Sequence, residues 1–505
     1  MLALCMIVTV LAGCGGGSNE GQGEETTVRT DLNLVSNGKF RSTDPQLTNT
    51  IVDRYVFWQV YEGLTFYNEL TASVDPQLAS SWDISEDGTV YTFHLRDDVY
   101  FHNGEQMKAS DVVFSLNRSK QEEMPISTNM KCIADVKALD DYTVEVTLSA
   151  PTAQFLVNLC YTFMLSEKEV TEQGETFGTG KTLAGTGPYM YEEVVFDEKI
   201  VLTAFDKYYG GEAPIKTVNY LVMTDSAAAA LALEGGQIDW LNVGVTDYQR
   251  LEADANFGHE VLPTGHITYL MFNPNSAKEP LQNEKVRQAM AYAIDKEALN
   301  LLCYEGYAKV ADFFEDPDYN VAAPKHDVTY SYDPEKAKSL LAEAGYADGC
   351  DVGEITCFTG NYFEVLVTAV QSQWKEVGIN VELKWVDQSA LQAICVGHDY
   401  DICANGMGYT GDYSDYVRRC EGSAAFLDYA QAGYDADFIH EKFAAGSAEP
   451  DTAKRTEIYK AVDEYVASTA TYIPIFHRSA NMVWNSALKP LNRPSYYRIS
   501  EWSWI

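Results

Sequence analysis

Helices and strands alternate between residues 283 and 386, and this order restricts the possible folds more than any other feature of the sequence. Polar caps, apolar residues at helical spacing and terminating glycines predict four helices. They begin after Asn283, after Asp295, at Pro334 and at Phe363, and the last two stop at Gly345 and Gly378. Alternating apolar residues from Ile379 to Trp385 then predict a strand. Such alternation is typical of α/β lobes, in which helices cover a sheet.

The segment between residues 89 and 148 predicts β structure around one short helix. Residues alternate in polarity from Thr89 to His94 and again from Asp141 to Leu148, as they do in half-buried strands. Further β structure with turns is predicted from Val99 to His102. A helix is predicted over Asp111 to Arg118, with Ser110 as its N-cap.

The first 28 residues predict a secretion signal and a tether. Residues 1–13 are mostly apolar and end in a small-residue cleavage site before Cys14, and this run is too short for a stable transmembrane helix. Leu11–Cys14 resembles the lipobox of bacterial lipoproteins, which implies cleavage before Cys14 and a lipid on its sulfur. Residues 14–28, rich in Gly, Glu and Ser, then form a flexible tether. No Lys or Arg precedes Arg29, so we expect the true start codon to lie upstream.

Size and charge limit what the rest of the chain can do. The chain has 505 residues, whereas a single core stops growing at about 250–300 residues, so two or three lobes are expected. The formal net charge of −38 argues against nucleic acid and against an anionic membrane surface as partners. Its simplest interpretation is solubility.

Cysteines and histidines give no sign of a metal site. Of ten cysteines, eight remain beyond Cys5 and Cys14, an even number that permits disulfides in a secreted protein and also permits free buried thiols. No Cys-x-x-Cys pair is present, so no structural zinc is expected. His398 is interpreted as a loop residue, with metal contact as the alternative.

Enzyme motifs are also missing. Residues Gly178–Thr182 end like a P-loop, but residue 175 is Glu where that motif needs Gly, so we interpret the segment as a turn. There is no His-Glu-x-x-His and no Gly-x-Ser-x-Gly motif. We therefore expect a protein that is not an enzyme and needs no cofactor.

Six stretches, in the same order along the chain, resemble family 5 of the bacterial extracellular solute-binding proteins. They are Val60–Thr65, Phe93–Gly104 with Lys108–Ser115, Gly185–Tyr189, Glu234–Asp239, Val286–Asp295 and Asp333–Gly345. The resemblance implies a binding protein that delivers dipeptides, oligopeptides or nickel to an ABC importer. It implies a small-molecule or peptide ligand, a permease as partner, a monomeric state, and a place outside the cytoplasm on the outer face of the membrane.

The resemblance also implies a periplasmic-binding-protein-like fold of type II, with three lobes and closure about a hinge. By analogy, lobe I comprises residues 29–61, 183–270 and 475–505, lobe II residues 62–182, and lobe III residues 271–474. The hinge is then expected near Gly265–Asn275 and near Tyr472–His477, where strands would pass between lobes I and III.

The loop Met407–Asp415 resembles the family loop in which an aspartate binds the α-amino group of a peptide, and Asp412 is the matching residue. A carboxylate enclosed with an ammonium group removes the penalty that each would suffer alone in a dry cleft. Tyr409 would form an aromatic wall, and Thr410 and Gly411 complete the expected contact segment. The alternatives are a turn aspartate and a tyrosine packed in the core.

Two departures from the family pattern leave the ligand open. Asp415 is followed by Tyr416, not by the usual proline, and Cys357–Glu364 lacks the arginine that binds the ligand carboxylate in dipeptide binders. The ligand is then a longer peptide held by backbone pairing, a peptide without a free carboxylate, or a non-peptide solute such as a nickel complex or an oligosaccharide. A sensory or adhesive surface lipoprotein is the alternative of a different class, because fold does not fix function.

Overall fold

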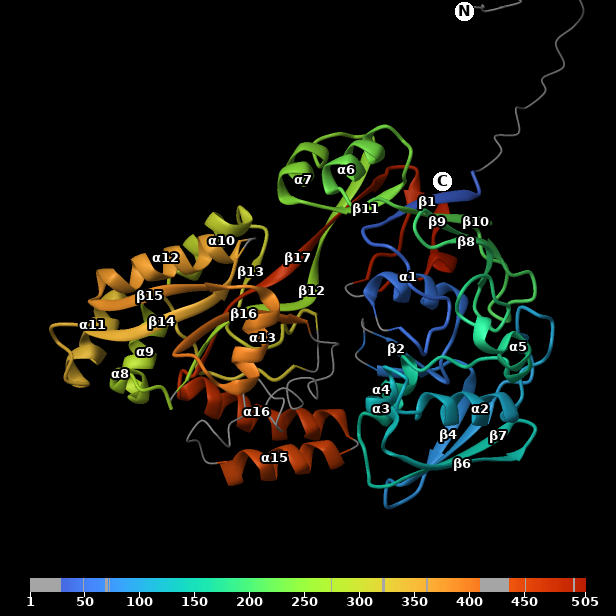
Figure 1. The fold of residues 1–505 in the computed structure, drawn as a ribbon, viewed down its shortest axis with the longest axis horizontal. Coiled ribbons are helices and arrows are strands. Elements are labelled where there is room, and N and C mark those ends of the chain that lie inside the picture. Colours follow the sequence, from blue (N-terminus) through green and yellow to red (C-terminus); the bar gives the residue numbers. More distant parts are fainter. Residues whose placement is uncertain are drawn as a thin grey trace, which may run out of the picture.

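The computed structural model describes residues 29–48, 50–68, 71, 73–273, 275–319, 323–359, 362–408, 436–449, 451–493 and 496–505. Its elements form two bodies joined by two long strands, β12 (Phe257–Phe272) and β17 (Tyr472–Asn485) (Figure 1). These strands pair antiparallel, and the sheet to which they belong continues into both bodies. The predicted α/β class is therefore confirmed, in a multi-lobed form.

The body at the right of Figure 1 carries one arm of this sheet, in the order β17-β11-β1-β10-β9-β8. Its strands are β1 (Asp31–Ser36), β8 (Tyr189–Val195), β9 (Lys199–Ala204), β10 (Thr217–Val222) and β11 (Trp240–Val243). Its helices are α1 (Ile51–Val60), α6 (Ser226–Glu234) and α7 (Val245–Leu251). The C-terminal β18 (Leu488–Lys489), η2 (Ile499–Glu501) and β19 (Ser503–Trp504) pack against the same core.

A second sheet, of order β4-β5-β7-β6, lies below that arm in Figure 1 and has a core of its own. Its strands are β4 (Ala79–Ile84), β5 (Val90–Leu95), β6 (Ile133–Asp140) and β7 (Thr143–Leu148), and a hairpin of β2 (Thr65–Asn68) and β3 (Ser73–Pro76) lies nearby. The helices are α2 (Ala109–Ser119), α3 (Ser127–Met130), α4 (Phe155–Cys160), α5 (Glu167–Gln173) and η1 (Gly174–Thr176). Burial alternates along β5 and β7, which confirms the two strands predicted from alternation.

One detail predicted for this region is wrong. Ser110 lies inside α2 and does not cap it, because the helix begins one residue earlier and Asp111 accepts the backbone N–H of Lys108 at 3.0 Å. The β structure with turns predicted from Val99 to His102 consists of one isolated bridge, between Tyr100 and Gln106, and a turn at His102 and Asn103. Gly178–Thr182 forms the predicted turn, whose Gly178 carbonyl accepts the N–H of Thr43 at 3.0 Å.

The left body of Figure 1 contains the other arm, in the order β15-β14-β16-β12. Its strands are β13 (Lys309–Val310), β14 (Cys350–Phe358), β15 (Ile379–Val386) and β16 (Ile402–Gly408). Its helices are α8 (Glu279–Gln282), α9 (Glu284–Tyr292), α10 (Lys296–Tyr304), α11 (Pro334–Glu343), α12 (Phe363–Glu376), α13 (Gln388–Gly397), α15 (Ala436–Ala448) and α16 (Thr452–Ser468).

The four predicted helices of this body are confirmed. The side chains of Asn283, Asp295 and Asp333 accept backbone N–H groups at the N-termini of α9, α10 and α11. Gly345 and Gly378, which follow α11 and α12, have φ angles of +91° and +92°, which only glycine adopts without strain. The apolar face of α12 ends in Trp374, which is fully buried.

Seven cysteines within the described residues form no disulfide with one another. The closest pair is Cys395 and Cys403, whose sulfur atoms lie 3.3 Å apart in a buried position. His398 ends α13 in the left-handed conformation, which agrees with its interpretation as a loop residue. The residue ranges assigned to the three lobes stay a prediction.

Candidate ligand-binding cleft

A cleft of about 660 Å³ lies at the point where β12 and β17 pass between the two bodies. Its lining comes from α1, β1, β10, β11, β12, β17, the end of β16 and the C-terminal segment. The residues are Val35, Ser36, Asn37, Phe40, Ile51, Val52, Tyr55, Tyr220, Trp240, Leu241, Asn242, Thr264, Gly265, His266, Gly408, Arg478, Ser479, Ala480, Met482, Arg493, Tyr496 and Tyr497. Concave sites of this size, mostly apolar with a few polar groups, are typical of small-ligand binding.

Aromatic rings form one wall of the cleft. Tyr55 stacks on Tyr497 with ring centroids 5.0 Å apart, and Trp240 meets Tyr497 edge-on at 5.1 Å. Burial raises the pKa of the Tyr497 phenol, which therefore stays neutral. Rings locked by such contacts offer a preformed apolar surface to a ligand.

Hydrogen bonds anchor the N-terminus of helix α1, which forms one edge of the cleft. Thr50 caps the helix by accepting the N–H of Asp53 at 3.3 Å. The buried Asp53 carboxylate in turn accepts the N–H of Arg41 at 2.9 Å, so it ties the segment before the helix to its first turn. Tyr55 and Val52 therefore reach the cleft from an anchored helix.

A bulge in β12 shapes the opposite wall. Between the pairs Pro263–Ser479 and Ile267–His477, β12 contains Thr264, Gly265 and His266, whereas β17 contains only Arg478. The Thr264 hydroxyl donates to the carbonyl of Arg478 at 2.7 Å, which fixes the two strands at this irregular point. Bulges often re-aim side chains beside binding sites, and here all four residues line the cleft.

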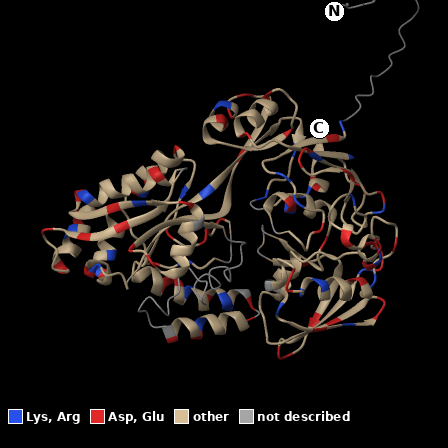
Figure 2. Cartoon of the chain, viewed as in Figure 1, with Lys and Arg blue, Asp and Glu red and all other residues tan. Residues whose placement is uncertain are grey.

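The charge of the cleft is opposite to that of the whole chain. Its lining includes Arg478 and Arg493 and, among the described residues, no Asp or Glu. The chain nevertheless carries 74 acidic and 36 basic side chains, and acidic positions are spread over both bodies (Figure 2). Arg493 already has a partner, because its Nη1 lies 2.8 Å from the Glu501 carboxylate.

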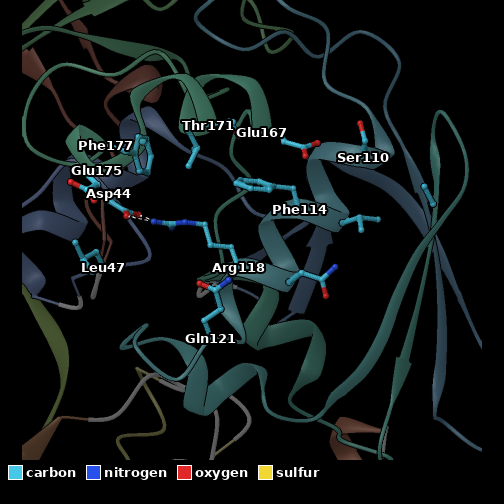
Figure 3. Close-up of a pocket in the computed structure, with 15 residues that line it drawn as sticks. Asp44, Leu47, Ser110, Phe114, Arg118, Gln121, Glu167, Thr171, Glu175 and Phe177 are labelled. Carbon is cyan, nitrogen blue, oxygen red and sulfur yellow. Dashed lines mark hydrogen bonds and ion pairs between the residues drawn. The ribbon is translucent and has the colours of Figure 1, made fainter.

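A second hollow, of about 860 Å³, lies between α2 and α5 (Figure 3). Its central cation, Arg118, points toward Asp44, and its Nη1 lies 3.1 Å from that carboxylate and 2.9 Å from the Gln46 side-chain oxygen. Because this charge is satisfied within the protein, the hollow is a weaker candidate than the cleft between the bodies.

The predicted contact residues Tyr409, Thr410, Gly411 and Asp412 lie outside the described residues, as does the predicted lipidation site Cys14. The cleft reaches Gly408, the last described residue before them. Sequence reasoning missed Tyr55, Trp240 and Arg478. The sequence did contain a signal for Arg478. It is the one residue among Asp, Glu, Lys and Arg in the otherwise uncharged run Tyr472–Asn485.

Two further observations concern the described part of the chain. It contains no group of three or more His, Cys, Asp or Glu side chains placed to hold a metal ion. Within the same residues, no helix combines the length and the apolar character needed to cross a bilayer.

The lobed α/β fold and the cleft beside its crossing strands define the class of ligand-binding proteins with hinged bodies. A family model described as "Bacterial extracellular solute-binding proteins, family 5 Middle" matches residues 73–420. The chain therefore belongs to family 5 of the bacterial extracellular solute-binding proteins, and the resemblance seen in its motifs is confirmed.

Known relatives agree with this assignment. The dipeptide-binding protein of Escherichia coli K12 is 29% identical over 460 residues, which are 83% of this chain and 83% of that protein. The ABC transporter substrate binding protein CtaP of Listeria monocytogenes is 26% identical, with a TM-score of 0.82 over 95% of this chain and 100% of that one. HbpA2 of Haemophilus parasuis is 25% identical, with a TM-score of 0.84 over 94% and 100%. These neighbours confirm the predicted type II periplasmic-binding-protein-like fold.

Proposed function

We propose that this chain is the substrate-binding lipoprotein of an ABC importer and that it captures a dipeptide or oligopeptide between lobes I and III. The observation that carries the proposal is the cleft, which has one aromatic wall and two arginines and lies where paired strands join the two bodies. In this proposal the chain acts as a monomer outside the cytoplasm, delivers its ligand to the permease subunits, and catalyses no reaction.

The names of several relatives support a peptide. They include the dipeptide-binding protein of E. coli, 29% identical, and a di/tripeptide-binding protein of Pseudomonas aeruginosa, 27% identical. A second candidate, binding of a non-peptide solute, is favoured by heme-binding protein A of Haemophilus influenzae, which is 27% identical over 457 residues. A sensory or adhesive role without import would be distinguished by the absence of permease and ATPase genes near the coding gene.

Closure on the ligand is the first prediction. The bodies are joined by β12 and β17 and meet again where the N–H of Ala153 donates to the carbonyl of Ser447 at 2.9 Å. A ligand that contacts both bodies shifts the population toward the closed form. Saturating peptide should therefore reduce the radius of gyration in small-angle X-ray scattering and raise the melting temperature, because it binds only the native state. An unchanged scattering curve at saturating peptide would contradict closure of the two bodies.

Lipid anchoring is the second prediction. Cys14→Ala should leave the precursor unprocessed or release the protein from membranes into the medium, because the acyl chains on Cys14 supply the anchor. The measurement is detergent-dependent fractionation of cells that express either form. Cys132→Ala, at a half-buried thiol far from the N-terminus, is the control and should stay with the membranes. Identical membrane fractions for wild type and Cys14→Ala would count against the anchor.

A further inference from the structure

We propose that Arg478, presented by β17 opposite the β12 bulge, binds a carboxylate group of the ligand. The inference rests on the proposed function and specifies it, because it requires a peptide with a free C-terminus.

The backbone of β17 fixes the position of Arg478 in the wall of the cleft. Arg478 lies between His477 and Ser479, which pair with Ile267 and Pro263 of β12 on either side of the bulge. The hydrogen bond from Thr264 to its carbonyl fixes this point of the strand. The Arg478 side chain is half-buried and lines the cleft, so the guanidinium extends into it from a fixed point on a β-strand.

The two arginines of the cleft differ in whether their charge has a partner. Arg493 lies 2.8 Å from Glu501, whereas within the described part of the chain no carboxylate forms an ion pair with Arg478. A guanidinium withdrawn from water without a partner is unfavourable, and a carboxylate removes that penalty through two parallel hydrogen bonds. Of the two arginines that line the cleft, Arg478 is thus the one without an ion pair among the described residues.

Arg478 also acts on the second body. Burial raises the pKa of the Tyr362 phenol, at the start of α12, and the positive charge of Arg478 opposes that rise. The segment Cys357–Glu364 around this tyrosine has no Lys or Arg of its own. The Arg478 charge therefore reaches the start of α12 in the other body.

The test is a calorimetric titration of trialanine and trileucine, each as the free acid and as the C-terminal amide, into the full chain. For wild type the free acid should bind about 10- to 100-fold more tightly than the amide, the range expected for hydrogen bonds to a charged group. Arg478→Gln should weaken binding of the free acid by a similar factor and leave the amide almost unchanged. The two losses should not add, because they remove the same interaction. Arg478→Lys should fall between, since it keeps the charge and loses the planar fork.

Arg250→Gln is the matched control. Arg250 lies on α7, outside the cleft, and pairs with Asp247 and Glu234 on the surface. Its substitution should change neither affinity nor the preference for the free acid. Circular dichroism of each variant checks folding.

Three outcomes separate this inference from the proposed function. Equal affinity of wild type for acid and amide, or unchanged binding of the free acid by Arg478→Gln, would overturn the Arg478 assignment and leave peptide capture standing. Loss of acid and amide binding to the same extent in Arg478→Gln would also overturn it, because the arginine would then act on the cleft as a whole. Absence of peptide binding by the wild-type protein would overturn both.

Discussion

Asp412→Ala is expected to weaken binding of a peptide with a free amino terminus by roughly a hundred- to a few thousand-fold. Removal of the carboxylate leaves the ligand's ammonium group enclosed without a partner, at a cost on the order of 3–5 kcal/mol. N-acetylation of the peptide should cause a similar loss with the wild-type protein, because it removes the charge that Asp412 needs. The two losses should not add. Calorimetric titration of both proteins with free and acetylated trileucine completes the cycle.

Asp399→Ala is the control for this cycle. Asp399 is exposed and follows α13, shortly before the strand that leads to the predicted loop. Its removal changes the net charge by the same amount and should not change affinity beyond about 0.5 kcal/mol, as expected for a surface substitution. Unchanged binding of the free peptide by Asp412→Ala would refute the anchor and strengthen the case for a non-peptide ligand.

Trp374→Ala is expected to lower the free energy of unfolding of the left body by about 3–5 kcal/mol. The indole is fully buried in the core around α12, and its Nε1 donates to the carbonyl of Met290 at 2.9 Å. Its ring centroid lies 6.1 Å from that of Phe272 on β12. The substitution therefore opens a cavity and leaves a buried carbonyl without its donor. Urea unfolding, followed by circular dichroism, measures the loss.

Two variants show whether burial is the cause. Trp385→Ala removes the same side chain from β15, where it is 40% exposed, and should cost less than the core substitution by a wide margin. Trp374→Phe keeps an aromatic ring and loses the hydrogen bond, so its loss should be intermediate. Equal losses for Trp374→Ala and Trp385→Ala would contradict the packing described for α12.

The sequence predicts the helices of the left body well because their signals are local. The side chains of Asn283, Asp295 and Asp333 cap within a few residues of themselves, and Gly345 and Gly378 end helices by a backbone conformation that glycine alone adopts easily. The prediction that Ser110 is an N-cap was wrong because the carboxylate of its neighbour, Asp111, accepts the backbone N–H at the start of the helix. The run Val99–His102 is rich in apolar and aromatic residues, as strands are, yet its β pairing is limited to one isolated bridge between Tyr100 and Gln106.

The family motifs mark packing more than chemistry. The N–H of Gly187, in one motif, donates to the carbonyl of Val60, in another, at 2.9 Å. Glu62 accepts hydrogen bonds from Thr186, Tyr208 and Tyr209, and burial raises the pKa of its carboxyl group. Such residues identify the fold from sequence and say little about the ligand.

The cleft could not be assembled from the sequence because its walls meet only through long-range pairing. Arg478 and the segment Thr264–His266 become neighbours only when β12 pairs with β17 and bulges. Tyr55 and Tyr497 likewise stack on each other although they lie near opposite ends of the sequence. No periodicity or helix cap in the sequence indicates such a contact.

Native mass spectrometry of the purified, unliganded protein after incubation with a defined mixture of dipeptides, tripeptides and longer peptides tests the central claim most directly. The account predicts one bound peptide per chain, with free amino and carboxyl termini, and little binding of the acetylated or amidated forms from the same mixture. Failure to retain any peptide, together with a bound mass that matches a non-peptide solute, would contradict peptide capture.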